Sequence, residues 1–387
     1  MAASDPERKL RLLVEGWRFL AHSYSIVNHW HLLALLRRDD AALWFRDTPY
    51  FRPQWKAERG LFTPAEDDAI AALPPPGEAD MFDAALRMGF PYELRPACAK
   101  TTAVFVTSEF QAIPDSHFAG KPDFAALRDD PHFALITPSR WSAGACERFR
   151  LRPDQINVVP HGVEPSVFRP MPERRDEIRR RLGLDGFVFL NVGAMTENKG
   201  IGGLLRAFAM VARGHPGVRL VLKGLDELHN SKEILRVLLD RLSVSDRHAV
   251  ADRLLYLGGR CSMAEMAALY QAADLYVSPY HAEGFNIPVL EAAACGIPLI
   301  CTGGGATDDF VDDRFCRRIP SRSETVHYER IAGKQLWPDF DRLAGLMTES
   351  MEDGAWRDEA ARAGALHASS NYNWDIVAEK LLRVLAR

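Results

Sequence analysis

The sequence lacks several features that would assign a protein to a particular class. Its six cysteines include no C-x-x-C pair, which argues against a zinc ribbon or a disulfide framework and is typical of a reducing cytosol. No run approaches the roughly 20 apolar residues of a membrane span, and the N-terminus has charges and a proline where a signal peptide needs an apolar core. The formal net charge of −4 gives no basic field for nucleic acid. We expect a cytoplasmic protein that binds no nucleic acid; peripheral contact with the inner face of a membrane stays open.

What the sequence does contain is 387 residues of ordinary globular composition, enough for two or three domains. In the second half, short apolar segments alternate with amphipathic ones. Such strands predict a parallel sheet that helices cover on both faces. The expected strands are 187–193, 218–224, 253–259, 274–280 and 298–305, and the expected helices are 202–214, 232–242, 262–273 and 288–295.

The first half repeats this alternation less clearly. Its expected strands are 10–16, 42–47, 102–109, 133–139 and 156–162, and its expected helices are 25–38 and 140–150. Two prolines followed by a dense charge run predict a linker at 168–184 that leads into a short solvated helix. The expected domains are therefore 1–167 and 185–369, with a last helix in 370–387 that packs back toward the N-terminal domain. Ligands of such sheets bind at the carboxyl ends of the strands.

One segment, SPYHAEGFNIPVLEAAACGIPLI, carries two glutamates on either side of a predicted helix start. Glu283 follows an expected strand, and the amides from Gly284 to Ile287 lie at or before the first turn, where a phosphate or a sugar hydroxyl can bind. Glu291 lies about one turn inside the helix, and its side chain should lean back toward the same end. The two acceptors suit a ligand with hydroxyls at both ends and an anion between, such as a sugar nucleotide. The alternative is a solvated loop carboxylate and a capping glutamate.

A second segment, NVGAMTENKGIGGLL, places a lysine before another predicted helix. The expected strand ends at Gly193, and Lys199 precedes the helix, where its charge can neutralise a diphosphate. The spacing matches neither a P-loop nor a G-x-G-x-x-G motif. An exposed lysine without a ligand is the alternative interpretation.

Together with RLVLKG, EMAALYQAADLYVSPY and VVPHGVEPSVFRP, these segments resemble the retaining glycosyltransferases of family 4 over about half of the chain. The resemblance implies an α/β protein of the GT-B fold, in which two Rossmann-like doubly wound domains face a cleft. It implies that Glu283 contacts the donor hexose, Glu291 the ribose and Lys199 the diphosphate. The residues assigned to the donor site are Gly193, Lys199, Glu283, Gly284, Phe285, Asn286, Ile287 and Glu291, with Glu283 and Lys199 as the catalytic pair.

The chain departs from the family pattern at two places. Ala194 and Met195 stand where the family usually has an arginine, so that another residue must supply this phosphate contact; the candidates are Arg260, Lys223 and Arg140. Asn286 stands where a glycine is common, which can change the direction of that amide.

The implied activity is transfer of a hexose, with retention, from a UDP- or GDP-linked sugar to a hydroxyl of a saccharide or lipid-linked glycan. No cofactor besides this co-substrate is expected, and because no D-x-D metal motif stands out we expect no metal site. Two alternatives stay open: a nucleotide-sugar 2-epimerase of the same fold, and a non-catalytic scaffold that binds sugar nucleotides. The missing arginine motivates the second alternative.

The N-terminal half offers weaker candidates for contacts with the acceptor or the sugar, namely His22, Tyr24, Glu109 and His161. The alternative for the first cluster is that Ser23 or Ser25 caps a helix whose aromatic residues belong to the core. In GGGATDDF, Asp308 and Asp309 follow a strand, where a turn with solvated carboxylates is the expectation.

Overall fold

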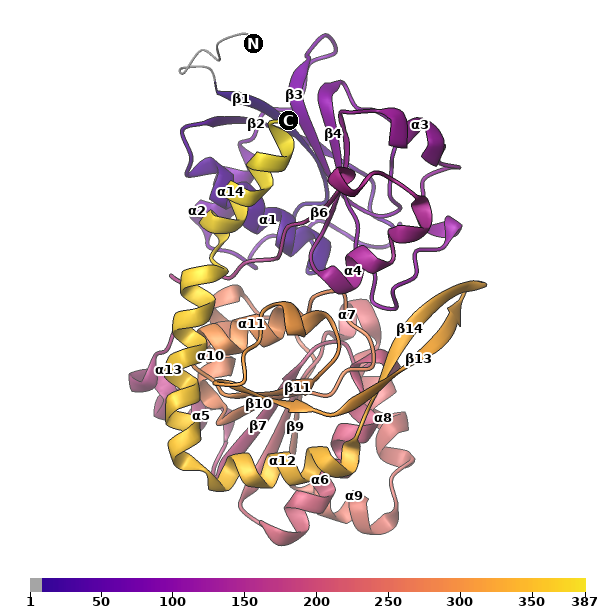
Figure 1. Cartoon of the computed structure of the whole chain (residues 1–387). Helices are drawn as coiled ribbons and strands as arrows, with labels where there is room; N and C mark the ends of the chain where they lie inside the picture. Colours follow the sequence, from indigo (N-terminus) through magenta and orange to yellow (C-terminus); the bar gives the residue numbers. More distant parts are fainter. Residues whose placement is uncertain (1–8) are drawn as a thin grey trace. The chain divides into compact units, whose positions relative to one another are not determined.

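The computed structural model describes residues 9–387, which form two compact units. The first unit contains the chain up to Gly162 together with Tyr328–Ile331 and Trp374–Arg387, and the second contains Val163–His327 and Ala332–Asn373. In Figure 1 the colours show that each unit is built from segments far apart in the sequence. The last helix thus belongs to the first unit.

The first unit is built around a parallel sheet of six strands in the order β2-β1-β3-β4-β5-β6. The strands are β1 (Leu10–Gly16), β2 (Ala41–Asp47), β3 (Phe82–Met88), β4 (Ala99–Phe105), β5 (Phe133–Thr137) and β6 (Ile156–Val158). The helices are α1 (Ser23–Leu36), α2 (Pro64–Ala71), α3 (Phe124–Asp129), α4 (Arg140–Gly144) and α14 (Trp374–Leu385), with 3-10 turns η1 (Asp115–His117), η2 (Glu147–Phe149) and η3 (Pro153–Gln155).

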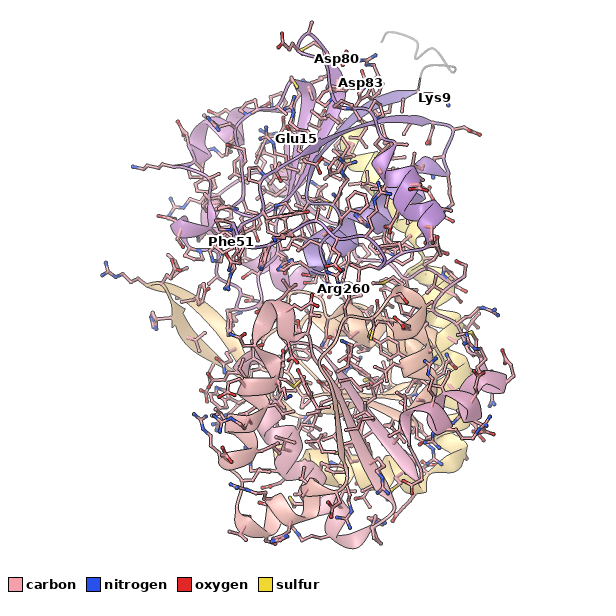
Figure 2. All side chains as sticks on the ribbon, turned by 180° about the vertical axis from the view of Figure 1, so that it is seen from behind. Lys9, Glu15, Phe51, Asp80, Asp83 and Arg260 are labelled. Atoms are coloured by element: carbon pink, nitrogen blue, oxygen red, sulfur yellow. The ribbon has the colours of Figure 1, made fainter. Side chains whose placement is uncertain are left out.

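Strand β1, which lies between β2 and β3, is buried on both faces, as its apolar composition predicts. Leu12 and Leu13 are fully buried, and Leu13 is paired with Trp44 of β2 and with Ala85 of β3. One charge also lies in this sheet: Glu15 accepts from Arg46 at 2.7 Å and from Arg87 at 2.6 Å (Figure 2). Two guanidinium groups offset the cost of burying this carboxylate.

The second unit has its own parallel sheet, in the order β12-β11-β10-β7-β8-β9. The strands are β7 (Phe187–Val192), β8 (Val218–Lys223), β9 (Leu254–Leu257), β10 (Leu275–Ser278), β11 (Leu299–Thr302) and β12 (Cys316–Ile319), and a separate hairpin contains β13 (Ser321–Tyr328) and β14 (Ile331–Pro338) (Figure 1). The helices are α5 (Arg175–Leu182), α6 (Ile201–Gly214), α7 (Asp226–His229), α8 (Ser231–Asp240), α9 (Val244–Ala251), α10 (Met263–Ala272), α11 (Ile287–Ala294), α12 (Phe340–Glu352) and α13 (Gly354–Asn371), with 3-10 turns η4 (Pro172–Arg174), η5 (Glu197–Lys199) and η6 (Ala306–Asp309).

Two parallel sheets covered by helices confirm the fold class expected from the sequence. Some elements differ from the expectation. Strand β3, strands β12 to β14 and helices α12 and α13 were not predicted, and the helix expected over 140–150 ends at Gly144. The short helix expected within 168–184 is present as α5, which is held on the second unit because Arg175 and Arg179 both pair with Asp274 at 2.5 Å.

Candidate functional site

The two loops that carry the predicted catalytic pair lie together at one edge of the second sheet. Strands β7 and β10 are neighbours, and the order of the strands reverses between them, which is where open α/β sheets bind ligands. The main-chain oxygen of Asn198 accepts from the amides of His281 at 2.7 Å and Ala282 at 3.3 Å. Asn198 Nδ2 also donates to Ala282 O at 3.2 Å. The loop after β7 is therefore docked on the loop after β10.

Gly200 allows this close approach. Its φ is +70°, and a Cβ atom there would lie 1.9 Å from the carbonyl oxygen of Pro279. A residue with a side chain would be strained by the left-handed backbone and would clash with the neighbouring loop. The glycine that follows Lys199 is thus a packing requirement of the site.

Lys199 and Glu283 form an ion pair inside this double loop. Lys199 Nζ donates to Glu283 Oε1 at 2.6 Å, and Glu283 is only 7% exposed. Gly193 is adjacent, because a Cβ built on it would lie 3.9 Å from the Lys199 side chain. The structure thus brings together Gly193, Lys199 and Glu283, three of the residues assigned to the donor site. Lys199 and Glu283 lie 84 positions apart in the chain.

The turn between Glu283 and α11 is fixed from both sides. Phe285 is buried and stacks on Phe310, with ring centroids 4.6 Å apart. Asn286 precedes the helix with φ +76°, and its Nδ2 donates to Ser278 Oγ at 2.9 Å. Asparagine and glycine are the residues that enter this left-handed region most readily, so Asn286 can take the place where the family often has glycine. Helix α11 begins at Ile287, as expected.

Glu291 is buried one turn further along α11. Its Oε2 accepts a hydrogen bond from the hydroxyl of Tyr270 on α10 at 2.8 Å. Burial raises the pKa of Glu291 to about 7, and the hydrogen bond from Tyr270 acts against this rise. The sequence reasoning assigned Glu291 but missed Tyr270. A tyrosine hydroxyl among the mostly apolar buried residues of α10 was the available signal.

The three candidates for the missing arginine differ in their surroundings. Lys223 is buried, and its Nζ donates to the carbonyl oxygens of Gly224 at 2.5 Å and Gly259 at 2.7 Å. Burial lowers the pKa of Lys223. Arg260 follows β9, with its Nη2 3.7 Å from Glu227 (Figure 2). Arg140 belongs to the first unit, at the start of α4. Lys223 and Arg260 are thus the candidates within the second unit.

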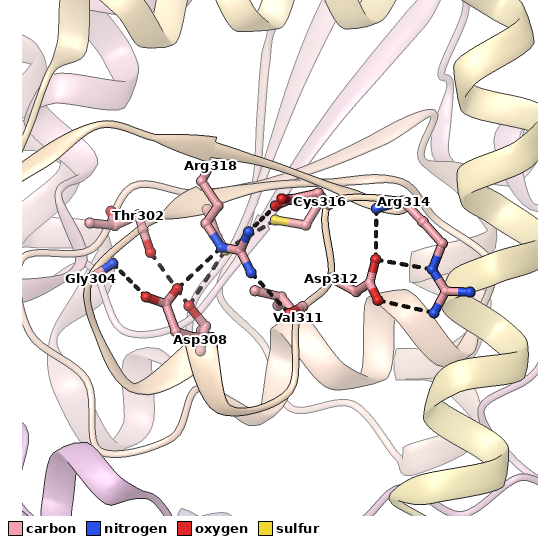
Figure 3. A network of polar contacts seen from close by, with 11 residues as sticks. Thr302, Gly304, Asp308, Val311, Asp312, Arg314, Cys316 and Arg318 are labelled. Atoms are coloured by element: carbon pink, nitrogen blue, oxygen red, sulfur yellow. Dashed lines mark hydrogen bonds and ion pairs between the residues drawn. The ribbon is translucent and has the colours of Figure 1, made fainter.

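The aspartates after β11 take part in a turn network. Asp308 Oδ2 accepts from the amide of Gly304 at 2.8 Å, and Oδ1 accepts from Arg318 Nε at 3.3 Å (Figure 3). Arg318 also donates to the carbonyl oxygen of Val311 at 3.0 Å. Asp309 contributes its main-chain oxygen to the hydroxyl of Tyr372 at 2.8 Å. The expected turn is present. The carboxylate of Asp308 is exposed, and it also accepts a hydrogen bond from Arg318.

In the first unit, His22 caps α1. Its Nδ1 accepts from the amide of Tyr24 at 3.3 Å, so neither Ser23 nor Ser25 is the cap, and Ser25 Oγ instead accepts from Leu20 N at 3.1 Å. Histidine can take the capping position because an unprotonated ring nitrogen accepts a hydrogen bond as a serine oxygen does. The hydroxyl of Tyr24 lies 2.8 Å from that of Tyr92.

The other two candidates of this unit have structural contacts. The main-chain oxygen of Glu109 accepts from Trp141 Nε1 at 2.7 Å. His161 is 6% exposed, beside the rings of Phe105 and Trp374, and burial lowers its pKa to about 3. His161 is thus neutral and buried, and a contact of His22, Tyr24, Glu109 or His161 with acceptor or sugar stays a prediction.

Every helix within residues 9–387 is too short or too polar to cross a lipid bilayer.

Comparison with known proteins places the second unit in a family. Residues 174–321 match the family described as "Glycosyl transferases group 1". The D-inositol 3-phosphate glycosyltransferase of Acidothermus cellulolyticus is 31% identical over 281 residues, 70% of this chain and 56% of that protein. The mannosylfructose-phosphate synthase of Agrobacterium fabrum is 27% identical over 243 residues, 62% of this chain and 49% of that protein. The chain thus spans about half the length of these curated relatives.

A solved structure shows the same fold over the whole chain. HepE of Anabaena, in complex with UDP and glucose, superposes with a TM-score of 0.66 over 97% of this chain and 99% of that chain, at 16% identity. Residues 174–321 therefore belong to the glycosyl transferases group 1 family, and the two parallel sheets of the chain have the GT-B fold.

Proposed function

We propose that this protein transfers a hexose from a nucleoside diphosphate sugar to a hydroxyl acceptor, with retention of the anomeric configuration. The observation that carries the proposal is the Lys199–Glu283 ion pair of 2.6 Å, held at the strand-order reversal beside the start of α11. An ammonium and a carboxylate there can bind the two parts of such a donor. Lys199 can bind the phosphates, and Glu283 can accept a hydrogen bond from a hexose hydroxyl.

The chemistry follows from where charge develops. The bond between the anomeric carbon and the diphosphate oxygen breaks with its electron pair left on the diphosphate, a bond to the acceptor oxygen forms, and the proton of the acceptor hydroxyl passes to the departing diphosphate. Negative charge grows on the departing diphosphate, where Lys199 and the amides before α11 are preorganised to stabilise it. Glu283 orients the hexose so that its anomeric carbon faces the acceptor. No side chain of this site is assigned as a covalent nucleophile.

The relatives suggest which substrates to test first. The structure of HepE contains UDP and glucose, and the names of the two curated relatives specify phosphorylated small molecules, D-inositol 3-phosphate and mannosylfructose phosphate. We therefore propose a uridine donor before a guanosine donor. For the acceptor we propose a hydroxyl on a saccharide, lipid-linked glycan or phosphorylated polyol. Contact with a membrane surface is expected only for the lipid-linked acceptor.

The test combines binding with turnover. UDP-glucose and GDP-glucose are screened by thermal shift, because a ligand of the native state raises the melting temperature. The nucleotide sugar that binds is then incubated with acceptor panels, and release of nucleoside diphosphate is measured. Glu283→Ala should reduce turnover by about a hundredfold to a thousandfold at unchanged melting temperature. Glu352→Ala, at an exposed position at the end of α12, is the matched control.

Three outcomes would contradict the proposal. Full activity of Glu283→Ala would reject its role. Isomerised sugar in the absence of acceptor, seen by NMR, would indicate a 2-epimerase. Binding without turnover against every acceptor would indicate a scaffold that binds sugar nucleotides.

A further inference from the structure

The contact between Tyr270 and Glu291 has a role that goes beyond packing. Within residues 9–387, the hydroxyl of Tyr270 is the single hydrogen-bond donor to the carboxylate of Glu291. It reaches Oε2, so that Oε1 is the oxygen left for a ligand. The carboxylate is 9% exposed and lies on the helix whose start forms the proposed donor site.

We propose that Tyr270 is a positioning residue that keeps Glu291 ionised and turned to accept the ribose hydroxyls of the nucleotide sugar, so that donor binding weakens when Glu291 takes up a proton. The inference rests on the proposed function and adds to it the residue that controls the nucleotide end of the site. An ionised carboxylate only accepts hydrogen bonds, whereas the protonated form has one donor and accepts more weakly.

Tyr270 is well placed to hold this geometry. Its ring is fully buried on α10 and packs against Phe168 and Tyr276, with centroids 6.2 Å and 5.9 Å away. The next residue, Gln271, fastens the same helix: its Oε1 accepts from Met171 N at 2.9 Å, and its Nε2 donates to Arg169 O at 2.7 Å. Because both the ring and the helix are fixed, the hydroxyl is held against Glu291.

The surroundings of Glu291 make its charge depend on this one donor. The titratable groups that face it are Tyr270 from α10, Tyr276 from β10 and Cys295 at the end of α11. The acid Glu283 also faces Tyr276 and is itself paired with Lys199. Helix α13 packs on α11 with a glycine, Gly364, against the backbone of Ala293. Burial raises the pKa of Glu291 to about 7, although the hydrogen bond from Tyr270 acts against this rise. Without that bond the pKa would be higher still, and the carboxyl would be mostly protonated at neutral pH.

The experiment measures the affinity of a nucleotide sugar as a function of pH. UDP-glucose, or GDP-glucose if the screen selects it, is titrated by calorimetry between pH 5.5 and 8.5, where its diphosphate has no protonation step of its own. For the native chain we expect affinity to fall about tenfold from pH 8 to pH 6. Tyr270→Phe should weaken binding about tenfold or more at pH 7, because it removes a hydrogen bond to a charged group. It should also move the midpoint of the change in affinity to higher pH. Glu291→Gln should bind weakly and without pH dependence.

The chain offers a matched control in Tyr276→Phe. Tyr276 is equally buried, but its hydroxyl bonds to the main chain of Val192 and not to a carboxylate. This variant should keep the native pH midpoint. The same midpoint in Tyr270→Phe as in the native chain would reduce Tyr270 to a structural residue and overturn the inference.

The failures of the two proposals are distinguishable. If neither nucleotide sugar binds the native chain, the proposed function is wrong. If one binds but Tyr270→Phe keeps native affinity and pH dependence, only the role of Tyr270 is wrong. Should Tyr270→Phe fail to fold, the native chain and Glu291→Gln decide: an affinity of the native chain that does not change with pH overturns the inference.

Discussion

The two buried glutamates of the second unit are compensated in different ways. Glu283 has an ammonium 2.6 Å away, which offsets its charge directly. Glu291 has a neutral hydroxyl at 2.8 Å, and burial raises its pKa to about 7. A neutral donor supplies less electrostatic stabilisation than a cation, so the ionised form of Glu291 costs folding free energy. A buried carboxylate that costs folding free energy fits a role in binding.

This cost can be measured as a dependence of stability on pH. The folded pKa of Glu291 is raised from its ordinary 4.5 to about 7, so the folded chain binds more protons in that window and loses stability as the pH rises through it. The rise corresponds to on the order of 3 kcal/mol. Glu291→Gln should therefore gain stability relative to the native chain between pH 4.5 and pH 8, measured by urea unfolding. A difference that stays constant across this range would contradict the raised pKa, and the exposed Glu352→Gln should show none.

The proximity of Lys199 and Glu283 in this site could be predicted from the sequence. Lys199 and Glu283 each follow an apolar strand, and the carboxyl ends of parallel strands share an edge, so their proximity was a consequence of the fold class. The contact between Tyr270 and Glu291 could not be predicted in this way. It joins the sides of two helices 21 positions apart, and their rotation about their own axes depends on core packing that periodicity does not specify.

At the scale of elements, the site depends on the docking of two loops. Gly200→Ala puts a Cβ atom 1.9 Å from the Pro279 oxygen and forces a non-glycine residue to φ +70°. We expect a loss of at least about 2 kcal/mol in the free energy of unfolding, together with weaker binding of nucleotide sugar, because Lys199 moves away from Glu283.

Another glycine of the same helix serves as the control. Gly214 ends α6, and an added Cβ there has nothing within 4 Å. Gly214→Ala should gain up to about 1 kcal/mol, since alanine favours a helix. Equal stability of the two variants would show that the loops do not pack as described.

Two of the strands that the sequence did not predict share a physical reason. Strand β3 carries Asp83 and Arg87 within seven residues, and β13 is polar over most of its length, so neither has the apolar run typical of a buried strand. In β3 these charges have partners: Asp83 Oδ2 accepts from the amide of Arg11, and Arg87 pairs with Glu15. Such pairing is visible only once neighbouring strands are known. Strands β7, β8 and β11 were predicted because their buried residues are mostly apolar.

On the scale of the whole molecule, the two units contain buried groups that titrate in opposite directions. The first unit buries His29, His31 and His161, and burial lowers the pKa of each from 6.5 to about 3. His29 Nε2 accepts from the amide of Phe19 at 3.0 Å, a contact that protonation of this nitrogen removes. The second unit buries Glu291, whose pKa is raised, together with His281, whose pKa burial lowers. A histidine with a lowered pKa stabilises above 6.5 and loses that contribution as the pH falls, whereas Glu291 destabilises as the pH rises.

Acidification from pH 7 to pH 5 should therefore weaken the first unit more than the second, where Glu291 and His281 act in opposite directions. Each buried histidine of the first unit accounts for roughly 2 kcal/mol at pH 5, because the unfolded chain takes up the proton that the folded chain excludes. Differential scanning calorimetry across this range should show a transition of the first unit that falls further than that of the second. Two variants assign each transition to a unit. His31→Leu should change the pH dependence of the first unit's transition alone, and Glu291→Gln should change the pH dependence of the second unit's transition alone. Two transitions that fall equally, or a pH response of either unit that its own variant leaves unchanged, would show that other groups control the acid stability of this fold.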